Sequence, residues 1–284
     1  DRYPEIRGIY DSLGKELTDI SFKGSIEEIS KTHNLQPIMI AFQLAVLKLI
    51  HTHKPGLLNG LSATCGLSLG EYSALALSGV IDEDDALRLV AVRGSLMGKA
   101  SENRSSKMLA ILKMTEEEVR KIIEENPDFK GKLYIANINS SRQIIVSGEG
   151  EAIDKLKAFL KANGKLAKPL AVSGAFHTPF MESAKDAFVT MLEGTSFNSP
   201  EISYYPNVTG EKYEGTPMSE VLSEQIVSPV LLYKTFKEMV ADGIKHFLEI
   251  GPGGVLSTIL EREFEGLEVS VIKNDDDLIE LLEA

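Results

Sequence analysis

The stretch "CGLSLGEYSAL", from Cys65 to Leu75, places a serine midway between two glycines and directly ahead of an apolar segment. Gly66, Ser68 and Gly70 match the pattern G-x-S-x-G, which is typical of a nucleophile elbow, a strained turn from strand to helix that exposes the serine oxygen. The glycines have no side chains, so strand and helix can approach closely. The same pattern also fits a small residue in a tight turn, so the flanking elements must distinguish the two interpretations.

The flanking sequence predicts the elements that an elbow requires. A short strand is expected over 61–64, and "LGEYSALALSG" predicts the helix that follows the turn. Two further helices are expected, a buried one over Gln36–Ile50 and one over 82–100 that carries Arg93. The backbone N–H of Leu69, at the start of the helix after the turn, would point toward an oxyanion that develops on a substrate.

The middle of the chain has a different pattern of predicted strands and helices. Strands and helices alternate over 104–172 in the order β-α-β-β-α-β, and Thr115 with Glu118 forms a T-x-x-E capping box at the first of these helices. This order predicts an inserted, ferredoxin-like small domain. Residues 1–103 and 173–284 then form the large domain, for which we expect an α/β-hydrolase-like core with a mostly parallel sheet. The predicted fold class is therefore α/β.

Composition excludes several classes of protein. The 284 residues are 43% hydrophobic and 25% charged, and 30 basic against 42 acidic side chains give a net charge of −12. This balance argues against nucleic-acid binding, because phosphate contacts need a basic surface. The sequence has no apolar run of membrane-spanning length and no basic-then-apolar N-terminal segment, so we expect neither a membrane span nor a signal peptide. Cys65 is the single cysteine, which excludes an internal disulfide and fits a cytoplasmic location.

A catalytic serine needs a base, and the chain has five histidines. His177, in "VSGAFHTPF", follows a predicted strand and precedes a helix with Thr178 as its N-cap and Pro179 at its first position. Side chains at such a place gather at the mouth of an α/β sheet. A base and an ordinary surface histidine both remain possible for His177. The other four lie in charged or polar settings at the ends of elements and are interpreted as surface or capping residues: His33, His51, His53 and His246.

An ordinary Ser-His-Asp triad is not favoured by the sequence. An α/β-hydrolase supplies an acid between the serine and the histidine in chain order, and no Asp or Glu stands out there at the end of a core strand. Cys65 is an alternative nucleophile, but its position on the strand side of Gly66 is typical of a buried, small apolar residue. Asp275–Asp277 are interpreted as a solvated helix start rather than a metal site.

Together these segments resemble the malonyl-CoA:acyl carrier protein transacylases of fatty acid synthesis and, more widely, the acyltransferase domains of polyketide synthases. The resemblance covers essentially the whole chain. It rests on six segments in the family's order and at its approximate spacing, which are "GLSLGEYSAL", "RLVAVRG", "ANINSSRQIIVSG", "GAFHTPFM", "EQIVSPV" and "EIGPGGVL". A single segment would be a weak match, whereas six in order are specific.

The resemblance implies a ping-pong acyl transfer. Ser68 would attack the thioester of malonyl-CoA, form a malonyl ester and pass the malonyl group to the phosphopantetheine thiol of acyl carrier protein. His177 would take the serine proton and later activate the incoming thiol. In this family a backbone carbonyl orients the histidine, and the matching position is Gln225, which would account for the missing acid. No bound cofactor and no metal are expected, because the coenzyme A thioester is itself the substrate.

The resemblance also implies how the substrate is held. Arg93 would bind the free carboxylate of malonate, because its planar guanidinium can donate two parallel hydrogen bonds. Phe176, immediately before the histidine, fits malonyl rather than methylmalonyl. Asn139 and the turn Gly251–Gly254 are weaker candidates for lining the cleft, with turn or packing roles equally open. Leu67 stands where most members have histidine, which should alter the polarity of the oxyanion pocket without abolishing the chemistry.

A second departure from the family lies at the N-terminus. The family opens with a strand and a "PGQG" turn whose glutamine contributes a backbone N–H to the oxyanion hole, whereas this chain begins inside what resembles the first helix. Losing one oxyanion donor typically costs about 10²–10³ in rate. We therefore expect about 25–30 further residues before Asp1 in the natural protein, to complete this hole.

The implied partners are malonyl-CoA and acyl carrier protein, with no nucleic acid and no membrane. Acyl carrier proteins are acidic, so this acidic chain would need local cations near the cleft, for which Lys165 and Lys168 are candidates. Three alternatives stay open: a serine esterase or thioesterase on the same elbow, a non-catalytic module that docks carrier proteins, and a free-standing acyltransferase of a polyketide synthase. The esterase would need an acid partner for His177 and would have no use for Arg93.

Overall fold

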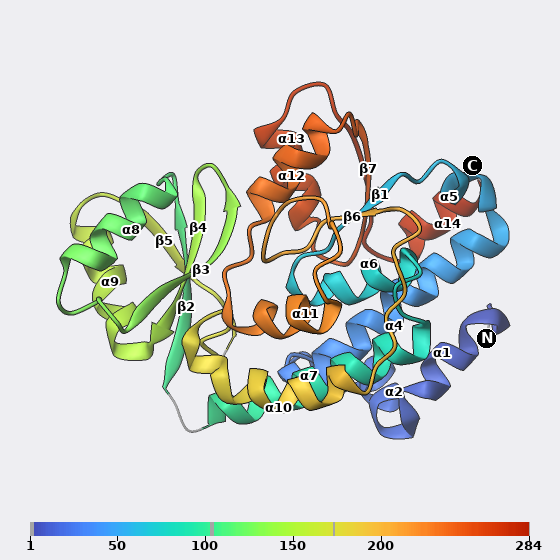
Figure 1. Cartoon of the computed structure of the whole chain (residues 1–284), viewed down its shortest axis with the longest axis horizontal. Helices are drawn as coiled ribbons and strands as arrows, with labels where there is room; N and C mark the ends of the chain where they lie inside the picture. The colour runs from blue at the N-terminus through green and yellow to red at the C-terminus, as the bar shows by residue number, and fades with distance from the viewer. Residues whose placement is uncertain (1–2, 103–104, 173, 284) are drawn as a thin grey trace. The chain divides into compact units, whose positions relative to one another are not determined.

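The computed structural model describes residues 3–102, 105–172 and 174–283 (Figure 1). The chain divides into two units, each of which is described by itself. The first unit comprises Asp1–Gly94, Thr195–Tyr205 and Glu238–Ala284, and the second comprises Ser95–Gly194 and Pro206–Lys237. The domain boundaries predicted at 103/104 and 172/173 fall on residues 103, 104 and 173, which lie outside the described residues.

The first unit is built around α4 (Thr32–His53), which extends the predicted helix at both ends. By length and composition α4 is the one helix among the described residues that could cross a membrane, but half of its most apolar window is buried, as in a core helix. The other helices of this unit are α1 (Arg7–Ser12), α2 (Gly14–Lys23), α3 (Ile26–Ile29), α5 (Pro55–Asn59), α6 (Glu71–Leu77), α13 (Val255–Glu263) and α14 (Asp275–Glu283), with the 3₁₀ turn η1 (Pro4–Ile6) before them. In addition, α7 (Glu83–Glu102) begins in this unit and α12 (Leu232–Ala241) ends in it.

The strands of the first unit form two parallel pairs. β1 (Ala63–Thr64) pairs with β6 (Ser203–Tyr204), and β7 (His246–Ile250) pairs with β8 (Glu268–Ile272). Parallel pairing is the strand direction that the sequence predicts for the large domain. The carboxyl ends of β1 and β7 lead directly into the two glycine-containing turns of the sequence, and ligand sites of α/β folds form at such strand ends.

The elbow follows β1. Ser68 opens a 3₁₀ turn, η2 (Ser68–Gly70), and has a φ of 50°, in the left-handed region that residues other than glycine rarely adopt. A Cβ on Gly66 would lie 2.1 Å from the backbone of Gly70, so only glycine allows this close approach. A Cβ on Gly70 would meet nothing nearer than the side chain of Gln43, at 3.9 Å. The mechanical role expected for both glycines therefore rests on Gly66.

The second unit contains the small sheet, whose elements follow the expected β-α-β-β-α-β order. They are β2 (Ser106–Leu112), α8 (Glu116–Glu125), β3 (Leu133–Ser140), β4 (Gln143–Glu149), α9 (Gly150–Ala162) and β5 (Leu166–Pro169). The strands lie in the order β3-β4-β2-β5, and all neighbours are antiparallel. Thr115 and Glu118 make both hydrogen bonds of the predicted capping box, which fixes the start of α8.

The two faces of this sheet pack differently. One face is covered by α8 and α9, whose Val119 and Leu156 join Leu109 in an apolar cluster. The other face carries a second, smaller cluster of Met108, Ala110, Ala136 and Ile145, against which Phe176 packs. Figure 1 shows both helices on the same side of the sheet. The sheet therefore positions the segment around Phe176 on the face away from its helices.

The second unit also contains η3 (Pro179–Met181), α10 (Glu182–Glu193) and α11 (Met218–Val227). The N–H of Val230, after α11, donates to the carbonyl of Ala136 at 2.9 Å, and its carbonyl accepts from Ile138 at 2.9 Å. These bonds attach the chain after α11 to β3. The second unit is consequently larger than the predicted small domain, because α10 and α11 group with the small sheet.

Replacing Gly66 with alanine should destabilise the protein by about 1–3 kcal/mol, because the new methyl group must displace the backbone of Gly70. Gly70→Ala is the matched control. Gly70 has a φ of −62° and open space around its Cβ position, so this variant should change the free energy of unfolding by less than about 1 kcal/mol. Urea denaturation measures both values, and equal effects of the two substitutions would contradict the close approach at Gly66.

Candidate active site

The hydroxyl of Ser68 is in direct contact with a buried cation. Arg93 donates from Nη2 to Ser68 Oγ across 3.1 Å, and from Nη1 to the side-chain oxygen of Gln36 across 2.8 Å. Arg93 lies on α7 and is only 1% exposed, and Gln36 lies on α4. Two helices thus position one guanidinium against the serine of the elbow, and two of the residues predicted from the sequence meet here.

The surroundings of Arg93 counter the cost of burying its charge, which is large for an unpaired ion. The ring centroid of Tyr72 lies 5.6 Å from its Cζ, within the range of a cation–π contact. Glu71 is fully buried and accepts a hydrogen bond from the hydroxyl of Tyr204. Burial lowers the pKa of the Arg93 guanidinium, and Tyr72 and Glu71 oppose that shift. The guanidinium nevertheless stays protonated at neutral pH, because arginine is not deprotonated in proteins.

A cation at this distance from a serine oxygen has two chemical capacities. It stabilises negative charge that develops on Ser68 Oγ during a reaction, and it can bind a carboxylate at the end of a short acyl group carried by Ser68. An acyl group without a carboxylate would bring no negative charge to pair with the guanidinium of Arg93. The geometry therefore distinguishes charged from neutral short acyl groups.

Cys65, the alternative nucleophile, lies next to the elbow but in an unreactive state. Burial raises the pKa of the Cys65 thiol to about 12, and the nearby carboxylate of Glu71 adds to the shift. Because the thiolate is the reactive form, a thiol with this pKa is almost entirely protonated and inert near neutral pH. Cys65 is partly exposed and lines the cavity beside the elbow, so it is less buried than the sequence predicts, although its thiol is unreactive.

A cavity of about 390 Å³ opens beside the elbow. Leu67 and Leu69 line it from the elbow, and residues of the turn Gly251–Gly254 line it from the end of β7. Gln43 of α4 joins the two sides by donating to the carbonyl of Ile250 at 2.9 Å. The last glycine of the turn has a φ of 60° and precedes α13, so a turn role for this segment has a direct structural basis.

The second unit holds His177 in the loop before η3. The ring is buried, and its Nδ1 lies 2.8 Å from the carbonyl oxygen of Gln225 in α11. A carbonyl oxygen can only accept, so Nδ1 carries a proton and donates, and Nε2 is the basic nitrogen of the neutral ring. His177 has a φ of 58°, again in the left-handed region. A ring fixed in this tautomer is suited to act as a general base.

The loop that carries His177 is held from both directions. Thr178 donates to the carbonyl of Ala175 at 2.6 Å and accepts from the backbone N–H of Phe180 at 3.2 Å, which makes it the N-cap of η3, as the sequence predicts. Lys185 of α10 forms an ion pair with Glu224, the residue before Gln225. The histidine and the carbonyl that orients it therefore belong to elements that are bonded to each other.

Two further predicted residues belong to the second unit. Asn139 on β3 is buried, and its side-chain oxygen has no hydrogen-bond partner among the described residues. Phe176 is partly buried, and a Cβ on Gly174 would lie 2.3 Å from its ring, so glycine at 174 makes room for the ring. Asn139 is thus a polar group available inside the unit, whereas Phe176 is fixed by packing.

Two of the remaining histidines lie in ion pairs with glutamates. His53 lies 2.6 Å from Glu5, and His246 lies 2.9 Å from Glu268, both as partly or largely exposed pairs. Within the described ranges, no group of three or more His, Cys, Asp or Glu side chains could hold a metal ion. The first unit thus holds Ser68 with Arg93, and the second unit holds His177 with Gln225.

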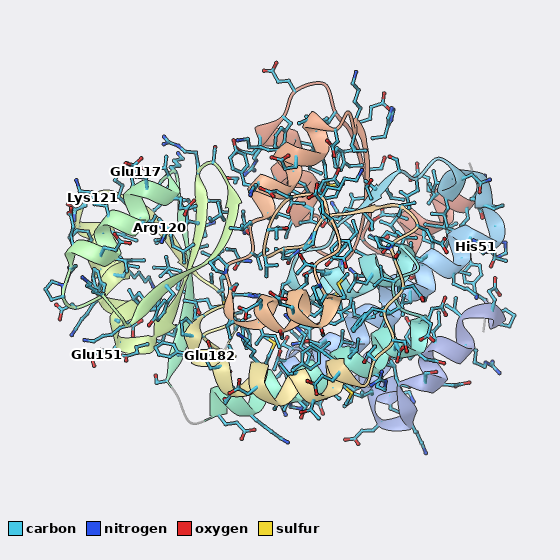
Figure 2. All side chains as sticks on the ribbon, viewed as in Figure 1. His51, Glu117, Arg120, Lys121, Glu151 and Glu182 are labelled. Atoms are coloured by element: carbon cyan, nitrogen blue, oxygen red, sulfur yellow. The ribbon has the colours of Figure 1, made fainter. Side chains whose placement is uncertain are left out.

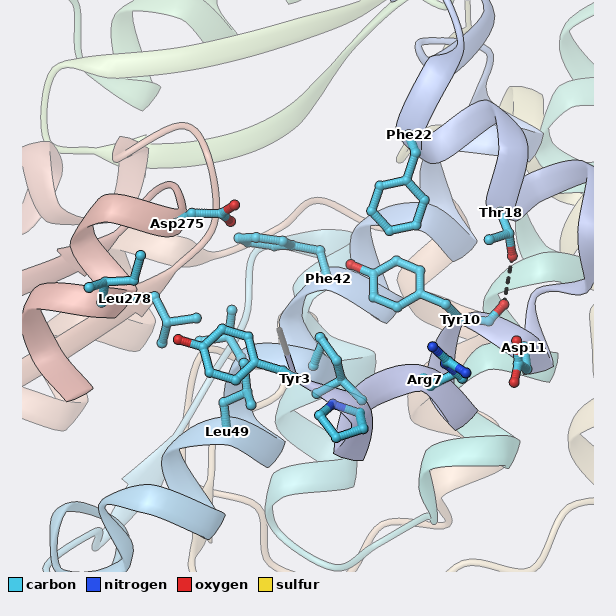
Figure 3. A pocket seen from close by; sticks show the side chains of 15 residues that line it. Tyr3, Arg7, Tyr10, Asp11, Thr18, Phe22, Phe42, Leu49, Asp275 and Leu278 are labelled. Carbon is cyan, nitrogen blue, oxygen red and sulfur yellow. Dashed lines mark hydrogen bonds between the residues drawn. The ribbon is translucent and has the colours of Figure 1, made fainter. Parts of the chain in front are cut away.

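A larger cavity in the first unit contains none of the predicted site residues. It measures about 700 Å³, and Figure 3 shows aromatic rings around it, those of Tyr3, Tyr10, Phe22 and Phe42. Thr18 donates to the carbonyl of Tyr10 at 2.7 Å at one end of the cavity. Size alone therefore does not locate the reactive groups of this protein.

Two residues with evident roles near Ser68 were not among the candidates predicted from the sequence. Gln36 fixes Arg93, and its signal in the sequence is a polar residue at the start of a long apolar helix. Glu71 supplies a buried negative charge. An acid in the first turn of a helix is also common because it suits the helix dipole, so the sequence does not indicate a special role for Glu71. Both roles depend on long-range contacts that no local pattern reveals.

Known proteins are similar to this chain over almost its whole length. Residues 7–275 match the family model described as "Acyl transferase domain". The chain is 31% identical to the malonyl CoA-acyl carrier protein transacylase of Bacillus subtilis (strain 168), over 99% of this chain and 89% of that protein.

Solved structures are also similar to this chain over almost its whole length. The crystal structure of malonyl CoA-acyl carrier protein transacylase from Clostridium perfringens ATCC 13124 aligns with a TM-score of 0.90 and 32% identity, over 100% of this chain and 90% of that one. A type II PKS acyl-carrier protein in complex with its malonyl-transacylase aligns with a TM-score of 0.89 and 31% identity, over 99% and 92%. The extent of the family match and the identity to these relatives show that the chain belongs to the acyl transferase domain family.

Proposed function

We propose that this protein transfers a malonyl group from malonyl-CoA to the phosphopantetheine thiol of acyl carrier protein, through a malonyl ester on Ser68. The observation that carries the proposal is the hydrogen bond from the buried Arg93 to the hydroxyl of Ser68. Malonyl differs from neutral acyl groups in its terminal carboxylate, and a buried cation beside the nucleophile favours that charge. The names of the similar proteins describe the same transfer.

In the first half-reaction, Oγ of Ser68 attacks the thioester carbon of malonyl-CoA while Nε2 of His177 takes the hydroxyl proton. The tetrahedral intermediate then collapses, the carbon–sulfur bond breaks, and the coenzyme A thiol leaves with the proton from His177. The products are coenzyme A, a malonyl ester on Ser68 and a neutral imidazole. The carbonyl of Gln225 holds Nδ1, so the ring needs no carboxylate to fix its tautomer.

In the second half-reaction, His177 takes the proton of the pantetheine thiol, and the sulfur attacks the ester carbon. The carbon–oxygen bond breaks, Ser68 recovers a proton from His177, and the malonyl group leaves on the carrier protein. The same imidazole therefore accepts and returns a proton in both half-reactions of the ping-pong mechanism.

Arg93 changes partners during this cycle. In the structure its two terminal nitrogens donate to Ser68 and to Gln36. When Ser68 becomes an ester, its oxygen is a poorer acceptor, and the malonyl carboxylate takes over the hydrogen bond at Nη2. Gln36 keeps the guanidinium in place while this exchange occurs. The backbone N–H of Leu69 receives the oxyanion, and Leu67 keeps that side of the pocket apolar.

The proposal extends to the finer description of the fold. Residues 104–172 form a ferredoxin-like domain, inserted into an α/β-hydrolase-like core formed by 1–103 and 173–284. The β-α-β-β-α-β order and the antiparallel strand order β3-β4-β2-β5 support the first part, and the parallel pairs at the elbow support the second. The enzyme works in the cytoplasm on a coenzyme A thioester and needs neither a bound cofactor nor a metal, because the thioester is already activated.

Fatty acid biosynthesis is the pathway that we favour, since the similar transacylases act with an acyl carrier protein by name. A free-standing polyketide synthase acyltransferase is the second candidate, because a malonyl-transacylase that is similar to this chain is in complex with a type II PKS carrier protein. The chemistry is identical in both. A thioesterase or esterase is disfavoured, because water as the acceptor gives the buried Arg93 no function.

Ser68→Ala should abolish formation of the covalent malonyl intermediate, because the attacking oxygen is removed. Incubation with radiolabelled malonyl-CoA followed by pantetheinylated carrier protein should label wild-type protein first and the carrier second. Cys65→Ala is the control and should retain the label. Rapid release of free malonate from wild-type protein would instead identify a hydrolase, and absence of labelling would indicate a module without catalysis.

Arg93→Ala should lower kcat/KM for malonyl-CoA by roughly 10- to 10²-fold, because the charge-assisted hydrogen bond at Nη2 contributes about 1.5–3 kcal/mol. Acetyl-CoA has no carboxylate, so its kcat/KM should fall much less. The preference for malonyl-CoA over acetyl-CoA should therefore decrease. Arg88→Ala, on the same helix but in an exposed ion pair with Asp85, is the matched control. An unchanged malonyl preference in Arg93→Ala would refute the role of this residue.

Native Cys65 should react with a thiol reagent at pH 8 roughly 10³-fold more slowly than free cysteine. Its raised pKa of about 12 leaves little thiolate at that pH, and the reactive fraction increases only as the pH approaches this value. The rate of modification, followed by absorbance in native and in urea-unfolded protein, provides the measurement. Rapid modification of native protein together with loss of activity would restore Cys65 as a nucleophile candidate.

A further inference from the structure

A short segment of the second unit combines exposed apolar side chains with lysines. We call residues 165–172 the β5 surface, because they comprise β5 and the residues on either side of it. Its apolar side chains are Leu166, 53% exposed, Leu170, 38% exposed, and Val172, 40% exposed. Among the described residues, eight large hydrophobic side chains are exposed, and three of them lie within this segment. Such a concentration of exposed apolar groups indicates a contact surface.

The charge around the β5 surface is opposite to that of the chain. The sequence from Lys155 to Met181 contains five lysines and no aspartate or glutamate, although the chain as a whole has a net charge of −12. Lys168 lies within ion-pair distance of no carboxylate among the described residues, and Lys165 lies 3.9 Å from Glu118. The surface is thus locally basic on an acidic protein.

More cations lie at the same end of the sheet. Leu112, the last residue of β2, pairs with Leu166 on one side and with Gln143 on the other. The next residue, Lys113, donates its backbone N–H to the carbonyl of Arg142 at 2.7 Å. Lys113 and Arg142 therefore extend the basic character of the β5 surface, and Glu118, next to Lys165, is the acid that faces them.

Protection of a sheet edge is the simplest alternative explanation. β5 is the last strand in the order β3-β4-β2-β5, and lysine and proline on an edge strand prevent pairing with other chains. That purpose accounts for Lys168 and Pro169. It does not account for Leu166, Leu170 and Val172, since exposed apolar side chains make an edge strand more prone to association. The combination is better explained by a specific partner.

We propose that the β5 surface docks the acidic carrier protein that delivers the acceptor thiol, an assignment that rests on the proposed function. An acidic partner is repelled by a protein of net charge −12 unless it meets a local basic region, since charges act over about 8–10 Å at physiological salt. The lysines steer the partner, and the three apolar side chains bury against it. Val172 is five residues before His177, so this surface is close in sequence to the loop of the proposed base.

Charge reversal tests the docking surface. The double variant Lys165→Glu/Lys168→Glu should raise KM for pantetheinylated carrier protein by about tenfold or more and weaken its dependence on salt. Transfer to free pantetheine, which has no protein to dock, should stay within about twofold of wild type. Lys121→Glu/Lys212→Glu is the matched control, with the same charge change at two exposed lysines outside residues 155–181. Lys121 is labelled in Figure 2.

A second variant tests the apolar part. Leu166→Asn/Leu170→Asn should raise KM for the carrier while leaving its salt dependence unchanged, because the charges are intact. If both double variants keep the wild-type KM for the carrier, the docking surface is wrong while the transferase function stands. If they instead convert a dimer into a monomer in sedimentation, the surface binds a second copy of the chain and the inference is likewise overturned. Absence of transfer in the wild type would refute the proposed function itself.

Discussion

The buried guanidinium of Arg93 is the constraint on which the first unit depends. An ion inside a protein must have its hydrogen bonds and its counter-charge in place, and here three elements supply them. Gln36 comes from α4, Ser68 from the elbow, and Glu71 and Tyr72 from α6. The packing of these helices therefore cannot be varied independently of the nucleophile. The same interaction links the core to the serine that we propose as the carrier of a charged acyl group.

In the second unit, His177 is held by a backbone carbonyl rather than by a charged group. A catalytic imidazole needs one nitrogen held and the other basic, and the carbonyl of Gln225 performs the first task without adding charge. A carboxylate in that place would bring a negative charge close to a substrate that already carries one. The neutral carbonyl avoids that repulsion, which suits an enzyme whose acyl group is an anion.

The sequence was sufficient where function depends on local pattern. The elbow, the capping box at Thr115 and the β-α-β-β-α-β order all follow from spacings of a few residues. From residues alone, Arg93 was indistinguishable from a surface arginine and His177 from a surface histidine. The partnership of Arg93 with Gln36 joins residues 57 positions apart, and that of His177 with Gln225 joins residues 48 apart. Only folding, or resemblance to a family, reveals such contacts.

Ser68 and His177 share a backbone property that carries a cost. Among the described residues, only they and Lys113 have a positive φ without being glycine, a conformation that costs roughly 1–3 kcal/mol at each position. Glycine would relax the chain at 68 or at 177 but would remove the reactive atom. The two proposed catalytic residues therefore hold backbone conformations that cost stability, and the hydrogen bonds of Ser68 with Arg93 and of His177 with Gln225 offset part of that cost.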